Sequence, residues 1–510
     1  MSAVADSVRE RRRESLSHPS FASQNGHAAA APMVRRMRIW GTPGQIWLLT
    51  TIFLLASSVV VLSIHAEVDG ARQTFDAIGT HGEPNLTYAQ DLYFVLAAMD
   101  ADAADYLLVA ANPSPPLTTD RIRGDYQALR QTAVNLAISA AQNVVNSDQR
   151  YGLYRLQTRL HLFDSDVAIA WQLSDQGRRA DAILAWEQAT DIMQNEVDGI
   201  LEAALSLADI DRQTLDTAYA QSQAQPAPSR LPIVVAVAGS AGIVSLALLM
   251  LYLFRRTRRV VNPPLVVAGI LALAMIAGAY QALAVSGERL RTAKQAYDTV
   301  DAIRQTRAFV FDSKAEESRY LLDPGRRRMY ESVFLLRSRS VATFASRPTL
   351  ATYDAALAQQ LEVLERGGTP ALGGSLGIAL SGVSGDEEAA TARTVVASYA
   401  KFQADDRVLR GAVARNDVRE AVRLSLSSQP GESQGDLIAL DADLGSWIGI
   451  EQTRGDANLA TGAQALDGWQ WIPLAALALV AGLAYLGIRP RLREYPGIVS
   501  IIADRLTTSR

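Results

Sequence analysis

Two apolar runs joined by a very short, arginine-rich loop constrain this chain most strongly. The runs at 231–254 and 263–285 each match the length of about 20 helical residues that crosses the hydrocarbon core of a bilayer. The loop at 255–262 is too short to hold a domain, so the runs are predicted to form a transmembrane hairpin. Because arginine and lysine gather on the cytoplasmic side of membrane proteins, we place the loop inside the cell. The arginines that support this placement are Arg255, Arg256, Arg258 and Arg259.

Two further apolar runs, at 45–66 and 469–488, bring the number of predicted spans to four. With the hairpin loop inside, both chain termini are cytoplasmic and the protein is predicted to be a multi-pass protein of the plasma membrane. The basic segment 1–44 lacks apolar periodicity and is predicted to be disordered. It is also long for the start of a signal peptide, so the first span is interpreted as an uncleaved anchor. The last segment, 489–510, begins with three arginines that are predicted to face the cytoplasm: Arg489, Arg491 and Arg493.

The distribution of charge gives an independent check of this topology. The predicted inside segments carry roughly 16 arginines against 5 acidic residues, whereas the outside segments 67–230 and 286–468 carry roughly 33 basic against 48 acidic residues. This separation agrees with the positive-inside rule. No Asp, Glu, Lys or Arg lies within any of the four runs, which argues against a transporter with a polar path through them.

Both outside segments show the spacing of helices. In 67–230, apolar residues recur three and four positions apart along two stripes, with Asp102 on the first stripe and Asp164 at the edge of the second. The stripes consist of Leu92, Val95, Met99 and Tyr106, and of Leu153, Leu156, Leu160, Phe163, Val167 and Trp171. Strand signals are scarce. We therefore predict an all-α membrane protein with four transmembrane helices and two extracytoplasmic antiparallel helical-bundle domains.

The second outside segment repeats this plan with one addition. The glycine-rich segment 367–385 is too rich in glycine for a regular helix interior, so a mobile or membrane-edge loop is expected there. A phosphate-binding loop is disfavoured, because the P-loop pattern and a preceding strand are missing. Helices are predicted at 287–322, 327–344, 349–366, 384–411, 415–427 and 433–463.

The two halves share weak internal similarity. DADAADYLL (100–108) aligns with KAEESRYLL (314–322), which pairs Asp102 with Glu316. IDRQTLDTA (210–218) aligns with IEQTRGDAN (450–458). Because both matches fall in order and at comparable distances from the spans, we predict a duplicated span–bundle–span unit.

The sequence offers little for catalysis or for cofactor binding. There is no cysteine, the five histidines are scattered, and no H-E-x-x-H pattern occurs. Asp100, Asp102 and Asp105 are expected to be solvated rather than to bind calcium, because their spacing spreads them around a helix. We therefore expect no enzymatic activity, no cofactor, no metal site and no nucleic-acid partner.

Three acidic residues are the candidates for a ligand or signal site. Asp102 lies on an apolar stripe, Glu316 is its counterpart in the repeat, and Asp164 borders a stripe of the same bundle as Asp102. A carboxylate in a bundle seam is unfavourable unless it is paired or hydrated. Two interpretations stay open: a water-exposed edge or a salt bridge, for instance with Arg155 or Arg159, and a position that lines a ligand cleft.

The chain resembles the actinobacterial GlnX family of four-span membrane proteins over most of residues 45–495. The segments that carry the resemblance are DLYFVLAAMDADAADYLL (91–108), AWEQATDIMQNEVDGILEAA (185–204), RAFVFDSKAEESRYLL (307–322), GGSLGIAL (373–380), LDADLGSWIGIEQTRGDA (440–457) and RPRLREY (489–495). The resemblance implies an amino-acid-sensing pathway with an extracytoplasmic solute-binding lipoprotein and the cytoplasmic serine/threonine kinase G. It transfers no ligand residue to this sequence.

These observations favour a membrane sensor or adaptor that passes an extracytoplasmic signal inward. The cytoplasmic segments are too small to hold a kinase or a cyclase, so the signal would pass to another protein. The alternative is a non-signalling scaffold of the cell envelope. Beyond the lipid bilayer and these partners, the sequence leaves open whether the protein forms a homo-oligomer.

Overall fold

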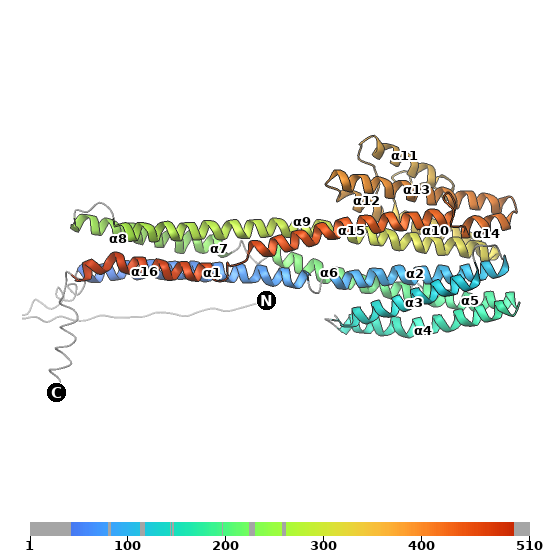
Figure 1. Cartoon of the computed structure of the whole chain (residues 1–510), viewed down its shortest axis with the longest axis horizontal. Coiled ribbons are helices and arrows are strands. Elements are labelled where there is room, and N and C mark those ends of the chain that lie inside the picture. The colour runs from blue at the N-terminus through green and yellow to red at the C-terminus, as the bar shows by residue number, and fades with distance from the viewer. Residues whose placement is uncertain are drawn as a thin grey trace, which may run out of the picture.

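In the computed structural model the chain forms an elongated, all-helical rod (Figure 1). The structure describes residues 42–493, apart from 80–82, 113–117, 143, 145–146, 196, 224–229 and 258–261. Within this part there are helices and no β-strand, which confirms the predicted fold class. The predicted disordered tail up to residue 41 and the chain beyond residue 493 lie outside the described residues.

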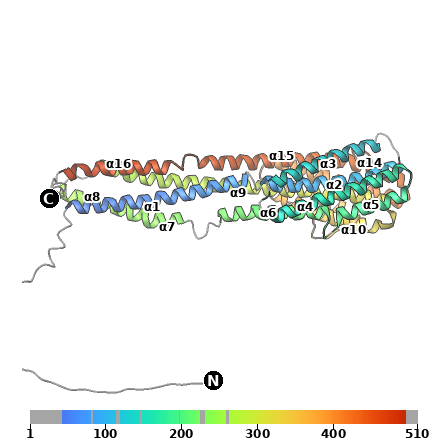
Figure 2. The same ribbon diagram turned by 90° about the horizontal axis from the view of Figure 1, so that it is seen from below.

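Four helices in the described part are long and apolar enough to cross a membrane. They lie together at one end of the rod, and the remaining helices lie at the other end (Figures 1 and 2). The second is composite, because a π-helical turn interrupts it. The first span lies in α1 (Thr42–Ala77), the third in α9 (Pro263–Leu322) and the fourth in α16 (Ile472–Arg493). The second consists of α7 (Arg230–Val234), the π-helical turn (Val235–Gly239) and α8 (Ser240–Thr257).

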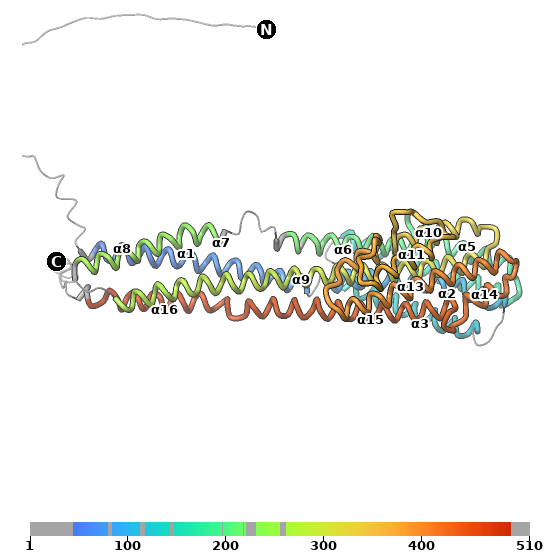
Figure 3. The backbone as a smooth tube through the Cα atoms, turned by 90° about the horizontal axis from the view of Figure 1, so that it is seen from above, coloured from blue at the N-terminus to red at the C-terminus, as the bar shows by residue number. Residues whose placement is uncertain are grey.

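Helix α9 is continuous from Pro263, just after the arginine-rich loop, to the far end of the rod (Figures 1 and 3). It has 60 residues, which corresponds to about 90 Å at 1.5 Å per residue. Pro263 and Pro264 occupy its first turn, where a missing N–H leaves no hydrogen bond unmade, and no proline follows within the helix. The third span and the core of the outer region are therefore one rigid element.

The outside helices of the first half are amphipathic, as their spacing predicts. The apolar residues of both predicted stripes are buried, from Leu92 and Met99 on one helix to Phe163 and Trp171 on another. The helices are α2 (Glu83–Ala111), α3 (Thr119–Gln142), α4 (Ser147–Asp175), α5 (Arg179–Gln194) and α6 (Ile200–Gln223).

The second half begins with the outer part of α9 and closes with a long helix that leads toward the fourth span. Most bounds lie within a few residues of the predicted ones. The helices are α10 (Arg327–Val341), α11 (Tyr353–Glu365), α12 (Gly374–Ser381), α13 (Asp386–Ala414), α14 (Val418–Leu426) and α15 (Ser433–Ala465), with 3₁₀ turns at Pro324–Arg326 and Leu350–Thr352.

The two halves share one apolar core, and the second half also has a core of its own around Phe402 and Trp447. One cluster of buried apolar side chains combines Phe163 and Trp186 of the first half with Tyr320, Leu409 and Leu426 of the second. Helix α2 packs along α9, and α15 packs on the other side of α9. Because apolar burial is the main stabilising term in folding, each half supports the other.

The expectation of a mobile or membrane-edge loop at 367–385 is wrong. Residues 374–381 form α12, which packs on α9 and α10 with Leu376 and Ala379 buried. The glycines permit close approach of neighbouring backbone instead of making the segment flexible. A Cβ on Gly374, whose φ is +76°, would lie 2.6 Å from the carbonyl oxygen of Val341.

Replacement of Gly374 tests this packing. We expect Gly374→Ala to lower the free energy of unfolding by roughly 2–4 kcal/mol, because the side chain combines a left-handed φ with a clash against backbone. Gly449→Ala is the matched control. Gly449 lies inside α15 with open space around it, so its replacement should raise stability by up to about 1 kcal/mol. Chemical unfolding of the full chain in detergent measures both, and equal effects would contradict the close-packing account.

Candidate functional site

The outer end of α9 carries a buried run of charged residues, which we call the charged segment. All residues from Asp312 to Arg319 are at most 2% exposed, although this run contains five charged side chains and two serines. Helices α2, α10, α14 and α15 enclose it. Buried charges are unfavourable unless each is paired or hydrogen-bonded, so the contacts of this segment hold the halves in one arrangement.

Arg319 is the centre of the first set of contacts. Its guanidinium pairs with Glu316 one turn earlier and with Asp100 of α2, and all three side chains are buried. Burial raises the pKa of Glu316 to about 7, against the opposing charge of Arg319. Burial also raises the pKa of Asp100, again opposed by Arg319. Two carboxyl groups thus share one arginine across the boundary between the halves.

Asp312 makes the second set of contacts. Its Oδ2 lies 2.6 Å from Nε of Arg337 on α10 and accepts a hydrogen bond of 3.1 Å from the hydroxyl of Tyr93 on α2. Gln194, at the end of α5, donates to both Asp312 and Asp100 at 3.1 Å. Asp312 therefore connects α9 to helices of both halves.

Lys314 belongs to a third set of contacts within the second half. Its ammonium group pairs with Glu317 and donates to the hydroxyl of Ser425 at 2.8 Å. Glu317 also accepts a hydrogen bond from Ser433 at 2.8 Å. A serine next to a lysine is a nucleophile–base arrangement in some hydrolases. Here Lys314 is already paired with Glu317, and all of these side chains are enclosed, so the geometry suits a structural role.

The three carboxyl groups predicted from the sequence are not brought together. Glu316 lies in the charged segment. Asp102 is half-buried on α2, with its Oδ2 enclosed and without a hydrogen-bond partner in the described structure. Burial raises its pKa well above the usual range, and the charges of Asp105 and Asp125 add to this. Neither Arg155, which lies over the ring of Tyr151, nor Arg159, which pairs with Asp198, reaches it.

Asp164 lies at the edge of its stripe, as predicted, and forms an ion pair between α3 and α4. Its Oδ2 lies 2.6 Å from Nε of Arg130, and its Oδ1 accepts a hydrogen bond of 2.7 Å from Tyr126. Of the two interpretations left open for Asp164, the structure therefore shows the salt bridge, formed with Arg130.

Of the arginines predicted to face the cytoplasm, Arg255 and Arg489 lie at the opposite end of the rod from the charged segment (Figure 1). Arg255 and Arg489 are exposed. Arg256, Arg491 and Arg493 lie on helices, but their side chains are outside the described part, as are Arg258 and Arg259 altogether.

The sequence analysis missed Asp100, Asp312 and Arg319. The expectation that the acids of α2 are solvated is wrong for Asp100 and Asp105, which are buried because α9 covers that face of α2. An available signal was the density of charge in DSKAEESR at the position where the halves align. No three acidic or histidine side chains in the described ranges are arranged to hold a metal ion.

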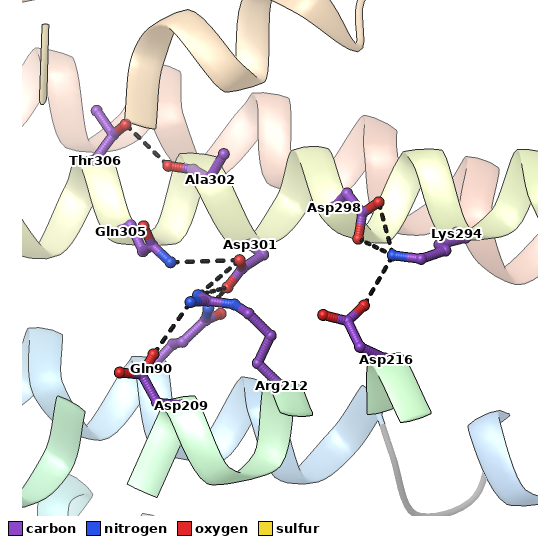
Figure 4. A network of polar contacts seen from close by, with 10 residues as sticks. All are labelled: Gln90, Asp209, Arg212, Asp216, Lys294, Asp298, Asp301, Ala302, Gln305 and Thr306. Atoms are coloured by element: carbon purple, nitrogen blue, oxygen red, sulfur yellow. Dashed lines mark hydrogen bonds and ion pairs between the residues drawn. The ribbon is translucent and has the colours of Figure 1, made fainter. Parts of the chain in front are cut away.

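A second polar junction lies nearer the membrane helices (Figure 4). Asp301 of α9 accepts hydrogen bonds from Gln90 of α2 and from Arg212 of α6. About two turns earlier on α9, Lys294 pairs with Asp216 of α6 at 3.0 Å and with Asp298 at 2.9 Å. Helix α9 therefore contacts the first half through polar side chains at two levels.

Comparison with known proteins gives one family match. A family model for an actinobacterial sensor domain matches residues 74–220. The match runs from the end of α1 to most of α6, which is less than a third of the chain. No curated protein and no solved structure matches the chain. The match supports a sensing role, and the four apolar helices are consistent with a multi-pass membrane protein.

Removal of the central cation tests whether the charged segment holds the halves together. We expect Arg319→Met to destabilise the full chain by about 3–5 kcal/mol, because Asp100 and Glu316 remain buried without their cation. Arg326→Met is the control, since Arg326 is half exposed and its pairing with Glu187 contributes about 1 kcal/mol or less. Adding Asp100→Asn and Glu316→Gln to Arg319→Met should recover much of the loss. Equal effects of the two arginine variants would contradict this account.

The raised pKa of Glu316 predicts a dependence of stability on pH. The folded chain binds this proton more tightly than the unfolded chain, whose pKa is near 4.5. Its contribution to stability is therefore full below about pH 4.5 and is lost as the pH rises through about 7. We expect Glu316→Gln to reduce the loss of stability between acidic and alkaline pH by about 1–3 kcal/mol, measured by chemical unfolding. Glu362→Gln, at an exposed pair with Arg366, should leave the pH profile unchanged.

Proposed function

We propose that this protein is a non-enzymatic membrane sensor or adaptor that passes an extracytoplasmic signal to a cytoplasmic partner. The match of the first outer bundle to an actinobacterial sensor domain supports the sensing part. The direction of transfer follows from the predicted topology, in which the arginine-rich hairpin and both tails face the cytoplasm.

The continuity of α9 is the observation that carries the proposal. One unbroken helix joins the charged segment at the outer end to the hairpin at the other end. Because a helix is stiff along its axis, a shift of its outer end is transmitted to the third span. Packed interfaces change between discrete arrangements, which suits a two-state signal.

The contacts of the charged segment suit such a switch. The ion pair between Asp100 and Arg319 joins the two halves, and any arrangement that separates them leaves a buried charge unpaired. A partner that docks on the outer bundles would act on this equilibrium if it bound one arrangement more tightly than the other.

The register of the aligned segments supports a duplicated unit. The alignment equates Asp100 with Lys314 and Asp105 with Arg319. The pair Asp100–Arg319 is then the counterpart of Asp105 with Lys314. Burial raises the pKa of Asp105, and the charge of Lys314 opposes that rise. When two copies of one unit pack about a two-fold axis, each contact between the copies recurs with the two positions interchanged, as these two pairs do.

The identity of the partners follows from the resemblance alone. We propose an amino-acid-loaded solute-binding protein outside and a serine/threonine kinase inside. The described arginines Arg255 and Arg489 lie at the exposed end where a cytoplasmic partner would bind. Arginines at the ends of the spans also fix the topology of a membrane protein, so a test must separate partner binding from topology.

Truncation of the last segment separates them. Deletion of residues 489–510 retains the fourth span up to Ile488, so membrane insertion should persist while transfer of the signal to the kinase is lost. The measurement is kinase-dependent phosphorylation in cells given the extracellular amino acid, with surface labelling of the outer bundles to verify insertion. A same-length tail in which Arg489, Arg491 and Arg493 are lysines should retain the signal if charge alone is needed. Normal signalling by the truncated chain would exclude a role for this tail.

Capture experiments distinguish the sensor from the scaffold of the cell envelope. Because the halves share a core, the bait should be the full chain in nanodiscs and not an isolated segment. Extracytoplasmic proteins that bind only with glutamate or aspartate present support the sensor. Partners that bind equally without either amino acid support the scaffold.

A further inference from the structure

A small cavity lies where α2, α6 and α9 meet, at the level of the second polar junction. Its volume is about 30 Å³. Gln90 and Tyr93 of α2, Asp209 and Arg212 of α6, and Arg304 of α9 line it together with apolar side chains. Tyr93 also donates a hydrogen bond to Asp312 of the charged segment, but no site residue predicted from the sequence lines the cavity.

Three arginine N–H groups of this lining are enclosed without an acceptor. They are Nε and Nη1 of Arg304 and Nε of Arg212, each buried and without a hydrogen-bond partner in the described structure. Arg304 is only 6% exposed, and its nearest carboxylate oxygen, on Asp91, is 4.0 Å from Nε, which is beyond hydrogen-bond distance. A buried guanidinium without an acceptor is unfavourable by several kcal/mol.

The acidic residues near the cavity are engaged elsewhere or hydrated. Asp301 accepts from Gln90, from Arg212 and, at 3.3 Å, from Gln305. Asp209 pairs with Nη1 of Arg212 at 3.2 Å and is largely exposed (Figure 4). Water therefore screens the charge of Asp209, whereas the charge of Arg304 is enclosed. The free N–H groups of Arg304 and Arg212 therefore lack a hydrogen-bond acceptor, and an anion, which accepts hydrogen bonds without donating any, would supply one.

We propose that this cavity binds a small monovalent anion, either a halide ion or the carboxylate of a small acid, held by Arg304 and Arg212. One water molecule needs about 10–15 Å³ of such a cavity, so this cavity has room for about two water molecules. That is room for one halide ion or for the two oxygens of a carboxylate. Guanidinium N–H groups form strong, charge-assisted hydrogen bonds to anions, and here Arg304 and Arg212 offer such donors from two different helices.

A bound anion would bridge α6 and α9. Helix α6 precedes the second span and α9 contains the third, so the anion would stabilise the contact between the halves next to the membrane helices. The site is independent of the signalling role proposed above, because it requires only that this junction is folded.

The test is anion-dependent thermal unfolding of the full chain in nanodiscs, followed by tryptophan fluorescence. Sodium chloride and sodium acetate are titrated separately, with ionic strength held constant by gluconate, whose chain exceeds the cavity. We expect a saturable rise of roughly 2–5 °C in the midpoint. Saturation with chloride alone assigns a halide, and saturation with acetate alone assigns a carboxylate. No saturable rise with either anion would mean that water alone meets these N–H groups and would overturn the proposal.

Three variants make the result specific. Arg304→Gln should weaken the apparent affinity at least tenfold, and an unchanged response would overturn the proposal. Ala208→Val fills the cavity without changing its charge and should also abolish the response, which keeps the test valid if Arg304→Gln does not fold. Arg307→Gln is the matched control one turn along α9. It removes the pair with Asp441 at 2.6 Å, so it should lower the midpoint but retain the anion response.

Discussion

The ion pair between Asp100 and Arg319 is the interaction on which the arrangement of this protein depends. It joins α2 to α9 at the outer end of the rod, where neither side chain contacts water. In a bundle held only by apolar contacts, two helices can slide by a turn with modest loss. A buried arginine that needs both Asp100 and Glu316 allows one register, because any other leaves a charge without its partner.

Because α9 is continuous, its register at the outer end also sets its position at the third span. The same helix carries the charged segment, the polar junction at Asp301 and the third span. Contacts at two levels therefore fix α9 against the first half both far from and near to the membrane helices. The shared apolar core around Trp186 and Leu409 joins the two outer bundles, so a displacement of either bundle acts directly on α9.

The polar groups along α9 also differ in how completely they are satisfied. In the charged segment most donors find an acceptor within the protein, as with Lys314 and Glu317. At the cavity near Arg304, three N–H groups do not. The charged segment also leaves Nε of Arg319 and Oε2 of Glu316 without partners, but those two side chains already pair with each other, whereas the free groups at the cavity are all donors.

The sequence by itself determined the four apolar helices, the all-α fold and most outer helix bounds, because hydrophobic period and run length are local properties. It also identified Glu316 as unusual, through its place in the aligned segments. It did not reveal that Asp100 is buried, that residues 374–381 form a packed helix, or that Arg304 lines a cavity. Those features depend on which faces of α2, α6, α9 and α10 meet. Only the tertiary structure decides such contacts, because they join residues that lie far apart in the chain and on different helices.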